Sequence, residues 1–133
     1  MADDHVIAAG KTFPWHEVYT KDVQASIDFY TGALDWGTTS MPMGEMGDYH
    51  MLTANGQPVC GVFPLEAVGD PNVPPHWATY IGVDDIDARL AKCEALGATK
   101  LMGPMEVATV GRMALICDPQ GAHVWLYEPA PQG

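Results

Sequence analysis

The 133-residue chain has the usual length of a single domain, and 47% of its residues are hydrophobic, which is enough to form one core. With 6 Lys and Arg against 17 Asp and Glu, its formal net charge is -11, so it repels nucleic acid and anionic membranes. The sequence has no apolar run of about 18 residues, and residues 1–11 lack the basic and apolar segments of a secretory signal. We therefore expect a cytoplasmic protein with no nucleic-acid and no membrane partner.

The three cysteines, Cys60, Cys93 and Cys117, lie far apart, and each is embedded in an apolar stretch. Their odd number and wide spacing favour neither a disulfide framework nor a zinc cluster. We expect reduced thiols in the core.

The first half of the chain predicts a strand, a helix and three further strands. Residues 15–20 are rich in β-formers, and Asp22 is placed to cap a helix. Apolar residues then recur at helical spacing from Val23 to Leu34. Strand-like runs follow at 37–41, 49–53 and 59–63, the last two joined by a turn at residues 54–57.

The second half repeats this order after a Pro- and Gly-containing stretch at 66–76. It predicts a strand at 78–83, a cap at Asp84-Asp85 and a helix from Ile86 that ends before Gly97. Strands are predicted at 106–110, 113–117 and 122–127, the last two joined by a turn at 118–121. A shift of 63 residues, which carries Asp22 onto Asp85, superimposes the two halves.

The repeat predicts how the domain is organised. Neither half buries enough surface to stand alone, so we expect an α+β domain in which two tandem βαβββ modules form a cupped mixed sheet around a cavity. The predicted parts are a tail (1–12), module one (13–65), a linker (66–76), module two (77–129) and a second tail (130–133).

Several segments resemble the vicinal oxygen chelate superfamily, which includes glyoxalase I, the bleomycin- and fosfomycin-resistance proteins and the extradiol dioxygenases. The most specific are Asp22 with Phe29-Tyr30 seven residues on, and the late Asp118-Pro119-Gln120-Gly121. The resemblance covers about residues 13 to 129. It implies the glyoxalase/bleomycin-resistance-like fold with a cavity in each cupped sheet, and a homodimer.

Family enzymes hold a divalent metal through His or Glu near the start of each module's first strand and in its last strand. By count, these positions fall on Trp15, Ala78, Trp125 and either Gly61 or Val62. None of these side chains coordinates a metal. We therefore expect no metal and no cofactor, which argues against glyoxalase I or extradiol dioxygenase chemistry.

Two polar residues are candidates for catalysis. Trp15, Glu17 and Tyr19 share one face of the first strand by its period of two, and Glu17 in an aromatic cavity would act as a general base or a hydrogen-bond acceptor. The alternative is a Glu that is satisfied by its neighbours at the cavity mouth. On the last strand His123 shares a face with Trp125 and would pair with Glu17, unless it lies in solvent.

Other residues are candidates for binding a substrate. His50 and Arg112 would anchor a carboxylate or a phenolate, although a surface ion pair is an equal alternative for Arg112. Flat apolar ligands are bound in cavities lined by aromatic rings. The candidate lining residues are Trp15, Tyr19, Tyr80 and Trp125, with Tyr49, Trp36 and Trp77 as further aromatics.

Three functions stay open. The first is a metal-free protein that binds a small aromatic or amphipathic molecule, as the antibiotic-resistance members of the resembled family do. The second is an enzyme that uses Glu17, with or without His123, for proton transfer in a lyase or isomerase reaction on a small carbonyl or epoxide-like substrate. The third is a dioxygenase-like enzyme with relocated metal ligands drawn from His16, Glu17, His50 and His123.

Overall fold

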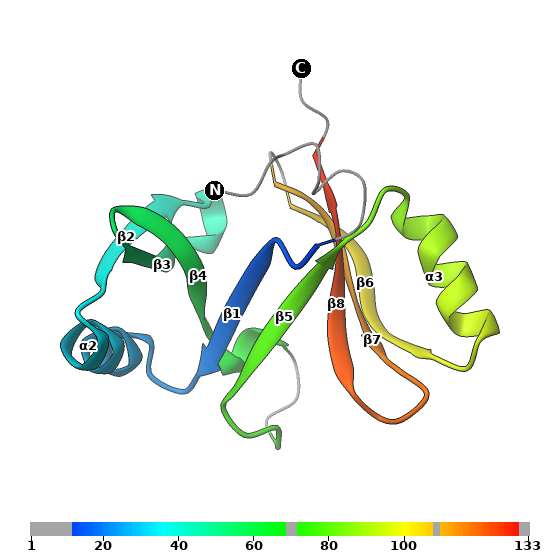
Figure 1. Cartoon of the computed structure of the whole chain (residues 1–133), viewed down its shortest axis with the longest axis horizontal. Coiled ribbons are helices and arrows are strands. Elements are labelled where there is room, and N and C mark those ends of the chain that lie inside the picture. The colour runs from blue at the N-terminus through cyan, green and yellow to red at the C-terminus, as the bar shows by residue number, and fades with distance from the viewer. Residues whose placement is uncertain (1–11, 69–71, 108–109, 131–133) are drawn as a thin grey trace. The chain divides into compact units, whose positions relative to one another are not determined.

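The computed structural model of the protein describes residues 12–68, 72–107 and 110–130. The first half contains β1 (Trp15–Thr20), α2 (Val23–Leu34), β2 (Gly37–Pro42), β3 (Asp48–Ala54) and β4 (Gln57–Pro64). The second half contains β5 (His76–Gly82), α3 (Ile86–Ala95), β6 (Thr99–Val107), β7 (Gly111–Cys117) and β8 (His123–Pro129) (Figure 1). Short 3-10 helices lie at η1 (Gly44–Met46) and η2 (Leu65–Val68).

The two modules have the same topology. The strands are ordered β2-β3-β4-β1 in module one and β5-β8-β7-β6 in module two. In each, the first strand runs parallel to the last, and the other neighbours are antiparallel. The predicted fold class of tandem βαβββ modules is therefore confirmed.

The two compact units of the chain divide within β5, between Ala78 and Thr79. The segment predicted as a linker, 66–76, contains the end of η2, and its last residue, His76, already begins β5. In the unit that contains Thr79 and the rest of β5, the N–H of Gly82 donates to the carbonyl of Thr12 (3.0 Å), which ties Thr12 to β5.

Both helices begin in the same way, as the repeat predicts. The side chain of Asp22 accepts a hydrogen bond from the N–H of Ala25 (3.0 Å), and that of Asp85 accepts one from Ala88 (3.1 Å). Each cap satisfies a backbone donor of the first turn that has no partner within the helix. No helix among the described residues is long and apolar enough to cross a membrane.

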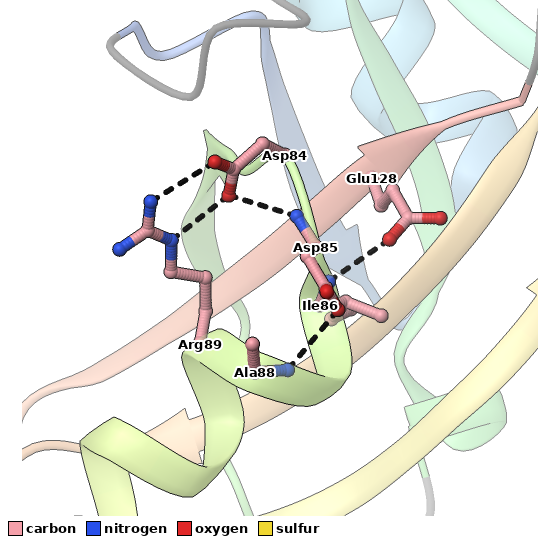
Figure 2. Close-up of polar contacts among 6 residues, drawn as sticks. All are labelled: Asp84, Asp85, Ile86, Ala88, Arg89 and Glu128. Carbon is pink, nitrogen blue, oxygen red and sulfur yellow. Dashed lines mark hydrogen bonds and ion pairs between the residues drawn. The ribbon is translucent and has the colours of Figure 1, made fainter.

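The start of α3 has a second anchor, shown in Figure 2. The carboxylate of Glu128, at the end of β8, accepts a hydrogen bond from the N–H of Ile86 (2.9 Å). Beside it Arg89 pairs with Asp84 at 2.9 Å, and this hydrogen bond holds the pKa of Asp84 at about 2. The Arg89 pair is exposed and contributes little to stability, whereas the Glu128 bond ties the helix to the last strand of its module.

Each helix covers one face of its module's strands and forms a core there. In module two this core contains Val83, Ile86, Leu90, Ala114, Ile116 and Leu126. In module one it contains Val18, Ile27, Leu52, Cys60 and Val62. Because side chains alternate along a strand, Trp15, Glu17 and Tyr19 lie on the opposite face from Val18, which we call the helix-free face of module one.

Two details depart from the prediction. Leu34, predicted on the buried face of the first helix, is 50% exposed at the end of α2. The strand predicted at 106–110 instead runs from Thr99 to Val107, as β6. The additional residues, Thr99 to Met105, include Pro104. Pro104 has no N–H to donate, but β6 is the last strand in the order and its pairing with β7 is irregular between Met102 and Met105, so no ladder bond is lost there.

Candidate functional site

The helix-free face of module one carries a buried carboxylate. Glu17, in the middle of β1, is 6% exposed. The hydroxyl of Tyr49, on β3, donates a hydrogen bond to Oε2 of Glu17. The indole Nε1–H of Trp15 in turn donates to the Tyr49 oxygen at 2.9 Å. We call Trp15, Tyr49 and Glu17 the triad.

A glycine makes room for the triad. Gly61 on β4 pairs in register with Glu17 on β1. A Cβ at position 61 would overlap the Tyr49 hydroxyl and lie 2.5 Å from Tyr49 Cζ and 3.1 Å from Oε2 of Glu17. Tyr49 therefore reaches across the bare backbone of Gly61, and any side chain there would displace it.

Aromatic rings pack beside the triad on the helix-free face. Phe63 lies with its ring centroid 6.0 Å from that of Tyr49 and 6.3 Å from that of Tyr19. Tyr19 is 2% exposed, and the His76 ring packs on it at 5.1 Å. A hydrogen bond in such apolar surroundings is stronger than one in water.

The surroundings also fix the protonation of Tyr49. Burial raises the pKa of the Tyr49 phenol far above its ordinary value, and the nearby Glu17 carboxylate raises it further. Both effects disfavour the phenolate, because burial removes its solvation and Glu17 repels a second negative charge. Tyr49 stays a proton donor to Glu17 throughout the neutral range.

The residues present do not fit the metal site that the family resemblance implies. The sequence left Gly61 and Val62 as candidates for the metal-ligand position in β4. The corresponding position in β8, Trp125, pairs with Tyr80, and Gly61 pairs with Glu17, which is the counterpart of Tyr80. The ligand position in β4 is therefore Gly61. Gly61 has no donor atom, and the space beside it is filled by a phenol whose raised pKa makes it a poor ligand. In the described parts of the chain, no three His, Cys, Asp or Glu side chains gather as a metal centre.

Module two has aromatic rings at the corresponding positions. Tyr80, the counterpart of Glu17, is 6% exposed, and its ring stacks on that of Trp125, with centroids 5.4 Å apart and planes 16° apart. The face opposite the α3 core is therefore aromatic at the positions where module one carries Glu17 and Gly61.

The other predicted site residues lie elsewhere. His50 alternates with Tyr49 on β3, so it lies on the helix-covered face with Leu52. Arg112 forms an ion pair with Asp87 of α3 at 2.8 Å, which is the alternative that the sequence left open for it. His123 is exposed at the start of β8. Within module one, His50 therefore lies on the face opposite Glu17.

The chain matches the model of the Glyoxalase/Bleomycin resistance protein/Dioxygenase superfamily over residues 5–126, and it belongs to that family. The resemblance seen in the sequence is thus confirmed. A Mycobacterium tuberculosis protein named "Putative glyoxylase CFP32" is 37% identical over 115 residues, covering 86% of this chain and 44% of that protein. The anthracycline biosynthesis protein DnrV of Streptomyces peucetius is 34% identical over 119 residues, covering 81% and 43%. The chain thus spans less than half the length of these relatives.

Solved structures show the same fold. The methylmalonyl-CoA epimerase of Mycobacterium tuberculosis is similar with a TM-score of 0.64 at 16% identity, covering 92% of this chain and 91% of that one. A hypothetical protein of Bacillus halodurans is similar with a TM-score of 0.62 at 17% identity, covering 92% and 96%. At these identities the likeness concerns the fold.

Proposed function

We propose that this protein binds a small aromatic or amphipathic molecule on the helix-free face of module one, without a metal, and that Glu17 is its polar anchor. The observation that carries the proposal is the triad: a buried carboxylate that accepts a hydrogen bond from Tyr49, whose ring packs against Phe63. Binding sites for small molecules combine such apolar walls with a few placed polar groups.

Two further observations support the proposal. Position 61, where family enzymes carry a metal ligand, is a glycine covered by the Tyr49 phenol. Glu17 would therefore contact a ligand without a metal ion bound at position 61. The relative DnrV is named for anthracycline biosynthesis, and anthracyclines are flat aromatic compounds that carry polar substituents. A flat aromatic ligand can stack on aromatic side chains, and the helix-free face carries the rings of Tyr19, Tyr49 and Phe63.

Binding can be located through the four tryptophans. Each gives one indole N–H resonance in a proton–nitrogen NMR spectrum, and Trp15→Phe identifies the one that belongs to the triad. Titration with flat aromatic compounds should shift the Trp15 resonance first, and Glu17→Gln should weaken binding. A ligand that shifts other indole resonances and ignores Glu17→Gln would place the site elsewhere.

A second function is favoured by one observation. Tyr49 donates directly to Glu17, so a proton donor and a carboxylate lie within hydrogen-bonding reach, as acid–base catalysis requires. An enzyme of this kind would exchange a carbon-bound proton of a carbonyl ligand with solvent. Deuterium incorporation into a bound ligand in heavy water, lost in Glu17→Gln, would show catalysis rather than binding alone.

A further inference from the structure

The triad has a fixed hydrogen-bond direction. The indole of Trp15 donates its proton to Tyr49 (2.9 Å), and the hydroxyl of Tyr49 donates its proton to Glu17. An indole nitrogen and a phenol each have a single polar proton. Both protons are therefore used inside the triad, and the donors run from Trp15 through Tyr49 to Glu17.

What the triad offers a ligand is consequently a set of acceptors. A carboxylate has roughly four lone-pair sites and no proton, and a phenol oxygen has two lone pairs. Tyr49 fills at least one site of Glu17, and Trp15 fills one lone pair of Tyr49. Any group that makes a further hydrogen bond to either oxygen atom must itself donate.

We propose that the site selects ligands that present a hydrogen-bond donor, namely a phenol, alcohol or ammonium group on a flat apolar body, over ligands that present an ether oxygen or an anion. The inference rests on the proposed function and adds a chemical class of ligand to it. The net charge of -11 acts in the same direction, because it repels anions. Tyr49 sets the direction of the hydrogen bonds in the triad, since its hydroxyl donates to Glu17.

The burial of Glu17 supports a preference for ligands that donate a hydrogen bond. Glu17 is 6% exposed, so an unpaired anion or ether oxygen brought next to it would lose its own solvation without gaining a donor. The raised pKa of Tyr49 keeps the phenol protonated, so the triad does not reverse in neutral solution.

Three naphthalenes that differ in one group test the inference on the full chain: 2-naphthol, 2-methoxynaphthalene and 2-naphthoate. Their dissociation constants follow from the shift of the Trp15 indole resonance. The wild-type protein should bind 2-naphthol about ten- to a hundredfold more tightly than 2-methoxynaphthalene, and 2-naphthoate more weakly still. Equal affinities, or a preference for 2-naphthoate, would overturn the inference while the proposed function stands. If none of the three binds, the proposed function fails and this inference with it.

Glu17→Gln makes the test sharper, because an amide accepts from Tyr49 and turns an N–H₂ donor toward the ligand. The preference for 2-naphthol over 2-methoxynaphthalene should then fall to within about threefold. Tyr30→Phe is the matched control: it deletes a phenol oxygen on α2 that accepts from Trp77 (3.2 Å), away from the triad. Tyr30→Phe should keep the full preference, and a preference that survives Glu17→Gln unchanged would contradict a role for the triad.

Discussion

Gly61 leaves open the space through which the phenol of Tyr49 reaches the carboxylate of Glu17. The two groups come from different strands, β3 and β1, and β4 lies between them in the strand order. A polar contact across an intervening strand requires that strand to carry no side chain at the crossing. The geometry of the triad is therefore decided by a residue that has no functional group of its own.

We expect Gly61→Ala to destabilise the protein by about 1 to 3 kcal/mol, because the new methyl group overlaps Tyr49 and forces it away from Glu17. Chemical denaturation gives the free energy of unfolding. In a Tyr49→Ala background the same substitution should cost much less, since the overlap is gone. Gly32→Ala is the control: it lies on α2 with nothing within 4 Å of the added Cβ and should stabilise by about 0.5 to 1 kcal/mol. An equal cost of Gly61→Ala in both backgrounds would show that Tyr49 does not occupy this space.

Stability should fall at high pH through Tyr49. Its pKa in the folded protein lies above the ordinary value of 10.0, so as the pH rises the unfolded chain releases this proton first. The contribution is complete below about pH 10 and decreases above it, by up to about 1.4 kcal/mol per pH unit. Tyr49→Phe should remove this slope in the free energy of unfolding.

The Cys60 thiol also lowers the stability at high pH, so its effect must be separated from that of Tyr49. Burial raises the pKa of the Cys60 thiol to about 11 from an ordinary value of 9.0, so it adds its own loss of stability over that interval. The difference between wild type and Tyr49→Phe isolates the phenol. If the two proteins lose stability in parallel from pH 9 to 11.5, Tyr49 ionises as freely in the folded protein as in the unfolded chain.

Much of the fold could be predicted from the sequence because its signals are local. Asp22 and Asp85 cap their helices one repeat apart, and the turn at Asn55 and Gly56 has positive φ angles of 53° and 77°, as the hairpin signal requires. The extent of β6 escaped prediction, because only the strand's place at the end of the order makes Pro104 tolerable.

The shared face of the candidate site residues could also be predicted from a local pattern. Strand alternation placed Trp15, Glu17 and Tyr19 on one face, and the structure has them there. Tyr49 was expected to supply an aromatic ring, and its role as the donor to Glu17 was missed, because that contact joins residues 32 apart in sequence. Gly61 was noted as a position without a metal ligand; its use as a passage for Tyr49 depends on the pairing of β3, β4 and β1, which no local pattern reports.

We expect a homodimer in solution. The edge strand of module one, β2, is exposed along most of its length, and Phe29 and Leu34 on α2 are 63% and 50% exposed. Open edges and apolar side chains of this kind are usually covered by another chain. Sedimentation equilibrium should give twice the mass of 14.3 kDa. A monomer that persists at high micromolar concentration would contradict the expectation.

The most direct test of a metal-free site at Glu17 is the affinity of 2-naphthol for the purified protein before and after dialysis against a strong chelator, with metal content measured in both samples. We predict less than about one tenth of an equivalent of divalent metal, an unchanged dissociation constant after chelation, and about ten- to a hundredfold weaker binding in Glu17→Gln. One equivalent of tightly held metal, with binding that is lost on chelation and restored by that metal, would contradict it.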